Sequence, residues 1–172
     1  TEEQIKEAIE WGKANKHASA HTGGARRTVQ SYSIHGEFAI LDTPFGMLAE
    51  SSRKAALQYR SLTDEERKTA LSFQDELCFG VVLYGDSIDF ARDYHAVIFY
   101  QDKVIQPIYE ENDEFAEPDF DRPKGFQYSA INFYDFPVEG EVIIDPNSVI
   151  TLVAVSPGGD EQRFRFDLSK MR

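Results

Sequence analysis

The chain has 172 residues, with 30 acidic against 18 basic side chains and a formal net charge of −12 at pH 7. Residues 73–145 hold 17 of the acidic and only 4 of the basic residues. The negative electrostatic field of this segment argues against binding to nucleic acid or anionic membranes and favours cations and basic partners. No apolar run reaches the roughly 18 residues of a transmembrane helix, and a single cysteine, Cys78, excludes an internal disulfide and a multi-thiolate zinc site.

The first helix is predicted over residues 2–14. Thr1 and Gln4 can form a capping box, and apolar residues recur on one helical face at Ile5, Ala8 and Ile9. Residues 15–27, with two adjacent glycines, predict a loop or flexible hinge. Residues 29–34 and 37–41 then alternate as strands, and Gly36 between them makes a hairpin plausible.

A second helix is predicted from Pro44 to about Arg60. Either Asp42 or Thr43 can serve as its N-cap, because proline suits the first helical position. A further capping box at residues 63–66 opens a third helix that runs to Leu71.

Beyond Phe73 the apolar period changes from 3.6 to 2, which indicates strands. A turn is predicted at residues 101–103. Gly158 and Gly159 predict a hairpin, because glycine allows a positive φ between two alternating segments. The predicted strands are 77–83, 94–100, 104–109, 126–134, 141–144, 149–155 and 162–168.

These elements predict an α+β fold with N-terminal helices and a mainly antiparallel β-sandwich or barrel-like β half. We expect strand 37–41 to join the later sheet, which favours one α+β domain over residues 1–172. Its parts are an N-terminal helix and loop (1–27), strands and helices (28–72) and a β-rich half (73–172).

The acidic segment 110–121 is the most unusual stretch, with seven carboxylates and no basic residue. Calcium prefers six to eight oxygen ligands, so the segment could hold this ion. The metal ligands we select are Asp113, Glu117, Asp119 and Asp121. The EF-hand pattern is absent, and a solvated loop or a docking segment for a basic partner remain alternatives.

The four histidines give weaker signals. His17 and His21 would share a face and could hold a transition metal if the first helix continued, although the glycines that follow favour a loop. His35 and His95 stand at a turn and at a strand start. A hydrolase with a site assembled from scattered His and Asp or Glu residues is therefore one alternative, without any nucleophile motif to support it.

We expect a non-catalytic secreted or cell-envelope binding module, without catalytic residues or a cofactor other than possible calcium. Its partner would be a protein, peptide or glycan, and part of the aromatic stripe Phe126, Tyr128, Phe133, Tyr134 and Phe136 could bind it if exposed. The layout resembles bacterial secreted proteins of unknown activity and carries no functional residue across. The chain begins at Thr1, as it would after removal of a signal or lipoprotein leader, or as a cloned fragment. A cytoplasmic location is the alternative to secretion or an envelope anchor.

Overall fold

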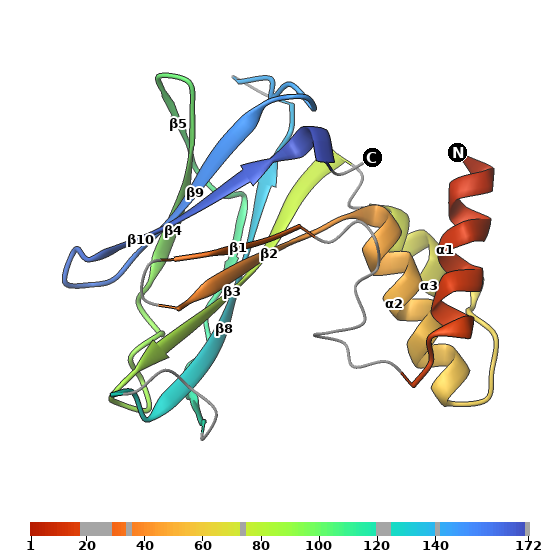
Figure 1. Ribbon diagram of the computed structural model, residues 1–172, viewed down its shortest axis with the longest axis horizontal. Helices are drawn as coiled ribbons and strands as arrows, with labels where there is room; N and C mark the ends of the chain where they lie inside the picture. Colours follow the sequence, from red (N-terminus) through yellow and green to blue (C-terminus); the bar gives the residue numbers. More distant parts are fainter. Residues whose placement is uncertain (18–28, 34–35, 73–74, 120–124, 140–141, 171–172) are drawn as a thin grey trace. The chain divides into compact units, whose positions relative to one another are not determined.

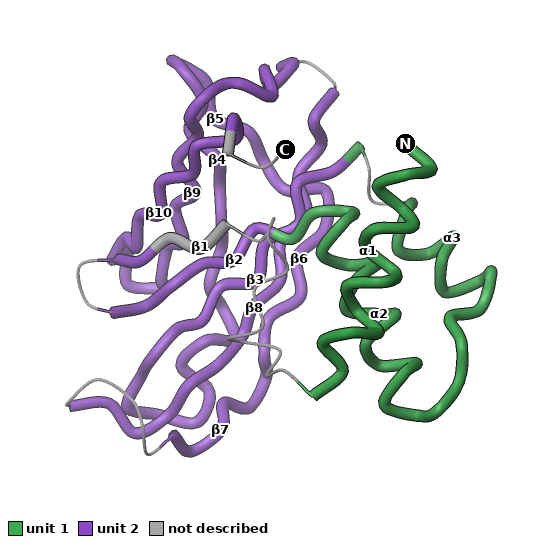
Figure 2. The backbone as a smooth tube through the Cα atoms, turned by 45° about the vertical axis from the view of Figure 1, so that its right-hand side comes forward, with its two compact units in different colours: residues 1–28, 42–75, 171–172 green, residues 29–41, 76–170 purple. Residues whose placement is uncertain are grey.

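The structure is a computed structural model that describes residues 1–17, 29–33, 36–72, 75–119, 125–139 and 142–170. The chain folds into two compact units (Figures 1 and 2). The helical unit comprises Thr1–Thr28, Asp42–Asp75 and Met171–Arg172, and the β unit comprises Val29–Leu41 and Glu76–Lys170. The expectation of one domain over residues 1–172 stays a prediction.

Three helices make up the helical unit, among the residues described, and all three were predicted. Helix α1 spans Glu2–Ala14 and begins with the expected capping box of Thr1 and Gln4. Helix α2 spans Pro44–Leu57, and its N-cap is Thr43, whose hydroxyl accepts a hydrogen bond from the Gly46 amide at 3.0 Å. Helix α3 spans Asp64–Ser72, and the Thr63 hydroxyl accepts from the Glu66 amide at its start.

Helices α1 and α2 approach closely because small residues lie at their contact. A Cβ atom on Gly12 would lie 2.2 Å from the backbone oxygen of Ala49. Beside this contact, the Ser52 hydroxyl donates to the backbone oxygen of Ile9 at 2.9 Å. An apolar cluster forms the interior of this unit, with Ala8, Leu48, Ala49 and Ala70 buried and Ile5, Ile9, Trp11, Phe45, Met47, Leu62 and Leu71 packed against them.

The β unit contains two antiparallel sheets. The first has the order β1 (Val29–Tyr32), β2 (Phe38–Asp42), β3 (Glu76–Gly85), β8 (Tyr128–Pro137) and β6 (Tyr109–Glu111), and β7 (Glu117–Pro118) also pairs with β8. The second has the order β10 (Glu161–Asp167), β9 (Val149–Val155), β4 (His95–Tyr100) and β5 (Lys103–Ile105), followed by a short 3₁₀ helix, η2 (Leu168–Lys170).

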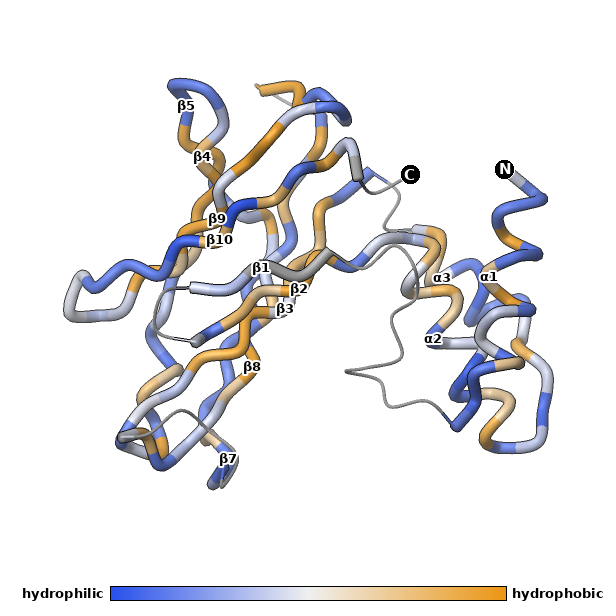
Figure 3. The backbone as a smooth tube through the Cα atoms, viewed as in Figure 1, coloured by the Kyte–Doolittle hydropathy of each residue, from blue (hydrophilic) through white to orange (hydrophobic). Residues whose placement is uncertain are grey.

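Aromatic side chains join the two sheets. The ring of Phe79 on β3 lies 5.1 Å from that of Phe166 on β10 in the other sheet, and 5.8 Å from that of Phe136 on β8 in its own sheet. Along β8, the buried residues alternate with more exposed ones, so Tyr134 and Phe136 belong to the interior and Phe133 to the outer face. Figure 3 shows hydrophobic residues along β3 and hydrophilic ones along much of β10. The predicted α+β fold with a β-sandwich is confirmed, and the sheets do not close into a barrel.

Two strand predictions were wrong. Residues 104–109 do not form one strand, because the chain leaves the second sheet after β5, passes Pro107 and enters the first sheet at β6. Proline cannot donate a backbone hydrogen bond, which explains the break. Residues 142–144 lie outside any strand. The pairing of the predicted strand 37–41 with the later sheet is confirmed, since β2 lies beside β3.

Candidate functional site

Three of the four predicted calcium ligands are described, and each is tied to β8 or to the segment that precedes it. The Asp113 carboxylate accepts a hydrogen bond from the Ile131 amide at 2.8 Å, so it ties the acidic segment to β8. Glu117 lies on β7 opposite Ser129, and the Asp119 amide donates to the Gln127 carbonyl oxygen. Asp121 lies outside the described residues.

The described acidic residues of this segment do not converge as a metal site would require. Among described residues, three or more ligand atoms come together only at Glu76, Cys78 and Asp135, within 4.8 Å of one another. Asp113, Glu117 and Asp119 are not part of that group. The calcium hypothesis stays a prediction, since one of its four residues is not described.

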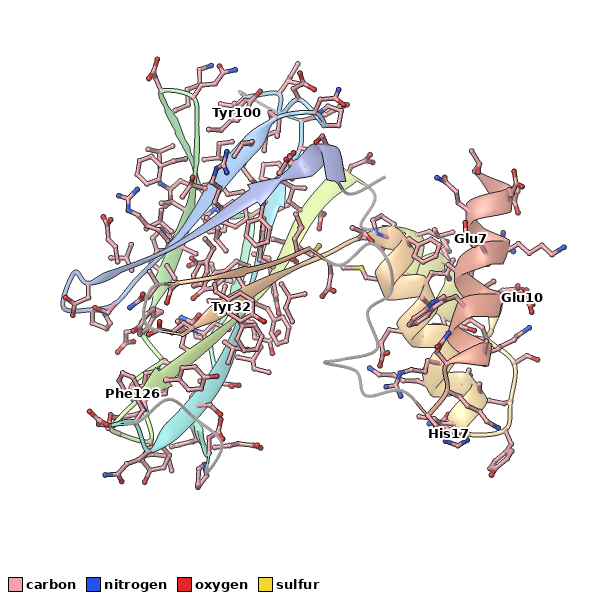
Figure 4. The ribbon with its side chains drawn as sticks, viewed as in Figure 1. Glu7, Glu10, His17, Tyr32, Tyr100 and Phe126 are labelled. Carbon is pink, nitrogen blue, oxygen red and sulfur yellow. The ribbon has the colours of Figure 1, made fainter. Side chains whose placement is uncertain are left out.

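The histidines are separated. His17 is exposed just beyond the end of α1 (Figure 4), whereas His21 and His35 lie outside the described residues. His95 lies 2.6 Å from Glu110 through Nδ1 and 3.0 Å from Gln106 through Nε2. Its side chain is 48% exposed. The pair has the contact that an acid–base site needs, but it lies at the surface, where water screens the interaction.

A network of amide and phenol groups, which the sequence did not reveal, holds the segment that precedes His95. The Asn132 side chain donates to the Ala91 carbonyl and to the Tyr134 hydroxyl, and the hydroxyl donates to Asn112 at 3.0 Å. Asn112 in turn donates to the carbonyl oxygens of Arg92 and Tyr94. Burial raises the pKa of Tyr134. The phenol is therefore a structural hydrogen-bonding group, and the network fixes the segment at the end of β6 against β8.

The register of β3, β8 and β6 brings acidic and aromatic residues together on the outer face of the first sheet. On β8, Asp135 lies opposite Cys78 of β3 and Tyr109 of β6, while Phe133 lies opposite Gly80 and Glu111. Residues directly opposite in an antiparallel pair share a face and have Cβ atoms about 5 Å apart. We call this surface the acidic–aromatic face, and its residues are Glu76, Cys78, Tyr109, Glu111, Phe133 and Asp135.

The aromatic residues of this face are exposed. Phe133 is 45% exposed and Tyr109 50% exposed. The Phe133 ring lies over Gly80, where an added Cβ would contact it at 3.5 Å. The Tyr109 hydroxyl donates to the Glu111 carboxylate at 2.6 Å, and this bond raises the pKa of Tyr109. The face therefore presents two aromatic rings beside carboxylates.

The carboxylates of the face have no basic partner in the part of the chain that the structure describes. No Lys, Arg or His nitrogen of that part lies within 4.0 Å of Glu76, Glu111 or Asp135. Cys78, 6% exposed, lies between Glu76 and Asp135 in the cluster. Uncompensated negative charge beside exposed rings is complementary to a cationic group.

The sequence signal for this face was present in part. The predicted aromatic stripe includes Phe133. Because buried and exposed positions alternate along β8, Phe133 lies on the outer face of the sheet and Tyr134 and Phe136 lie in the interior. Phe126 stacks on Tyr84 with ring centroids 6.3 Å apart. Cys78 and Asp135 meet only through a pairing of distant strands, which single-sequence periodicity does not reveal.

No family model matches the chain, and no curated protein matches it. The chain is similar to a protein of unknown function from Burkholderia pseudomallei K96243, with 11% sequence identity and a TM-score of 0.47. The similarity covers 96% of this chain and 90% of that one. Among the described residues, no helix is both long and apolar enough to cross a membrane.

Proposed function

We propose that the β unit is a non-catalytic binding module whose acidic–aromatic face takes an arginine side chain of a basic peptide partner. The observation that carries the proposal is the convergence of Glu76 and Asp135 beside exposed Phe133, with no basic group of the described chain paired to either carboxylate. A guanidinium ion is planar, accepts two carboxylate partners and stacks on aromatic rings.

Electrostatics support a basic partner over a neutral one. The three carboxylates of the face lie in the part of the sequence that carries the whole charge surplus, so a cationic peptide is attracted from a distance. Charged hydrogen bonds at a half-buried site are stronger than neutral ones. Phe133 and Tyr109 supply apolar contact for the methylene groups of the same side chain.

Fluorescence anisotropy with a labelled Gly-Gly-Arg-Gly-Gly peptide tests the proposal, and the same peptide with citrulline in place of arginine supplies the neutral probe. We expect saturable binding of the arginine peptide only. Asp135→Asn should weaken binding about tenfold or more, because it removes one partner of the ion pair. Phe133→Ala should weaken it several-fold.

Asp102→Asn is the matched control, since Asp102 is exposed in the turn between β4 and β5 and its loss changes the net charge equally. Equal binding of the citrulline peptide, or an equal effect of Asp102→Asn, would contradict the assignment. Such results would mean that the face does not recognise charge or that binding is only a net-charge effect.

A divalent metal ion is a second candidate ligand, and the Cys78 thiol favours it. Thiolate and carboxylate ligands together suit zinc or cobalt better than calcium. Titration with Co²⁺ tests this candidate, because thiolate ligation gives a near-ultraviolet charge-transfer band. Cys78 is the sole cysteine, so the band must disappear in Cys78→Ser. If no band forms with Co²⁺, the cluster does not bind the metal through its thiol.

The secreted or envelope location, bacterial origin and anchored-lipoprotein character expected from the sequence form part of the proposal. A single buried cysteine and an acidic binding face are compatible with a bacterial envelope. The coding sequence upstream of Thr1 tests this part. A signal peptide ending in a lipidated cysteine supports an anchored protein, and a cytoplasmic open reading frame without a leader contradicts it.

A further inference from the structure

The helical unit contains a cavity that the proposed function does not use. It has a volume of about 490 Å³ and is lined by residues of α2 and α3 and by Asp42. Clefts of roughly 300–1,000 Å³ are the usual size for sites that bind small molecules. All of its lining residues belong to the helical unit.

Asp42 is the unusual side chain of this cavity. Of the two residues that could cap α2, Thr43 does so, which leaves the neighbouring Asp42 carboxylate without a capping role. Within the described chain no hydrogen-bond donor or basic nitrogen contacts this carboxylate. Burial, and then the charge of Glu50, raise its pKa to about 6.

The other carboxylates at the cavity differ from Asp42, because two of them already have partners. Glu50 accepts two hydrogen bonds of 2.7 Å from Arg53 and lies 3.9 Å from Lys54. Glu66 accepts two bonds from Arg60, at 2.6 and 2.7 Å. Glu65, which also lines the cavity, is exposed to solvent. Among the described residues that line the cavity, Asp42 is therefore the half-buried carboxylate that has no partner and can pair with a bound cation.

The arrangement favours an organic cation over a metal ion. Metal binding needs several ligand atoms within a few ångström, and the only such group in the described residues lies elsewhere, at Glu76, Cys78 and Asp135. A primary ammonium group needs fewer partners, and one carboxylate with nearby hydroxyls suffices. Ser51 and Thr69 line the cavity with hydroxyls, and Met47 and Ala70 line it with apolar surface.

We propose that this cavity binds a small amphiphilic primary amine, with its ammonium group on Asp42 and its apolar part against Met47 and Ala70. The carboxylate and the ammonium ion lose their water together and form a charged hydrogen bond in a partly enclosed site. Met47, with its adaptable thioether chain, can pack against ligands of different shape. This site is separate from the acidic–aromatic face, and either can exist without the other.

The two methionines of the chain, Met47 and Met171, give a direct readout. With ¹³C-methyl methionine, the Met47 methyl resonance reports occupation of the cavity, and Met47→Leu assigns it by its disappearance. The probe is phenethylamine, and 2-phenylethanol is its neutral counterpart. We expect a saturable shift of the Met47 resonance with the amine and a dissociation constant at least tenfold weaker for the alcohol.

Asp42→Asn should weaken amine binding at least tenfold, since the amide cannot neutralise an ammonium ion. Asp75→Asn is the matched control, because Asp75 is exposed in the same unit and its replacement makes the same charge change. A melting curve for each variant verifies that it is folded. Unchanged amine binding by folded Asp42→Asn, equal binding of the alcohol, or no Met47 shift at 10 mM amine would each overturn the proposal.

Discussion

The backbone of Gly12 on α1 lies directly against the backbone oxygen of Ala49 on α2, so closely that an added methyl group would stand 2.2 Å from that oxygen. The neighbouring Ser52 Cβ would lie at 2.8 Å. Neither contact involves the flexible end of a long side chain. The two helices therefore need glycine at this position, and the apolar cluster between them depends on the close approach.

Gly12→Ala should destabilise the helical unit. The greater helix propensity of alanine contributes about 1 kcal/mol, but the overlap with a backbone atom forces the helices apart and costs more. We expect a net loss of about 1–3 kcal/mol in the free energy of unfolding, measured by urea denaturation. Gly158→Ala is the control, because its added Cβ would meet only ordinary contacts at 3.6 and 3.8 Å. A more stable Gly12→Ala protein would contradict the packing described.

Asp42 should make the free energy of unfolding decrease as pH rises, which is the opposite of the usual effect of an aspartate. Its pKa is about 6 in the fold, against an ordinary value of 3.8, so between pH 3.8 and about 6 the folded state binds more protons than the unfolded state. Stability therefore falls as pH rises from about 4 to about 6, and the penalty persists above that range. Asp42→Asn should raise the free energy of unfolding at pH 8 by up to about 3 kcal/mol and leave it unchanged below pH 4.

Urea denaturation of wild type and Asp42→Asn at pH 4, 6 and 8 measures this difference, and other carboxylates cancel in the comparison. If the stability difference between wild type and Asp42→Asn stays the same at all three pH values, the carboxylate is not desolvated as the structure indicates.

The phenol of Tyr134 should contribute measurably to the β unit. Tyr134→Phe removes the acceptor of Asn132 and the donor to Asn112 while it keeps the ring in the core. We expect a loss of about 1–2 kcal/mol, because the buried Asn132 amide and the half-buried Asn112 amide each lose a partner. Tyr128→Phe on the same strand is the control, as its hydroxyl forms no hydrogen bond within the described residues. Equal melting temperatures for the two variants would argue against the network.

The calcium hypothesis for Asp113, Glu117, Asp119 and Asp121 makes its own prediction. A site with a dissociation constant well below the millimolar range raises the melting temperature when millimolar Ca²⁺ is added, because the ion binds only the folded state. The Glu117→Gln variant should lose part of that shift, and Mg²⁺ at the same concentration should give a smaller one. An unchanged melting temperature with Ca²⁺ removes the hypothesis.

Local signals predicted much of the fold. The three helices begin at capping residues that make the expected hydrogen bonds, and the hairpin between β9 and β10 turns at Gly159 with φ +88°. The strand over residues 104–109 was wrong because the chain changes sheets there. The apolar pattern of these residues does not indicate which sheet each half of the segment joins.

The candidate sites were harder to predict than the fold, for a physical reason. Cys78 meets Asp135 through the pairing of β3 with β8, and the register of distant strands is set by packing rather than by local propensity. Asp42 was named only as a possible cap. Its uncompensated charge follows from the choice of Thr43 as the N-cap and from the burial of the position, neither of which a single sequence reveals.

The path of the chain limits how the protein can be divided. The hairpin of β1 and β2 belongs to the β unit, yet it lies in sequence between α1 and α2 of the helical unit. A fragment that starts at Glu76 would therefore lack both strands of this hairpin, and the loss of β2, the neighbour of β3, would leave the hydrophobic strand β3 at the edge of the sheet as a template for aggregation. Neither unit corresponds to one uninterrupted segment, so recombination or proteolysis at a single peptide bond cannot release either one intact.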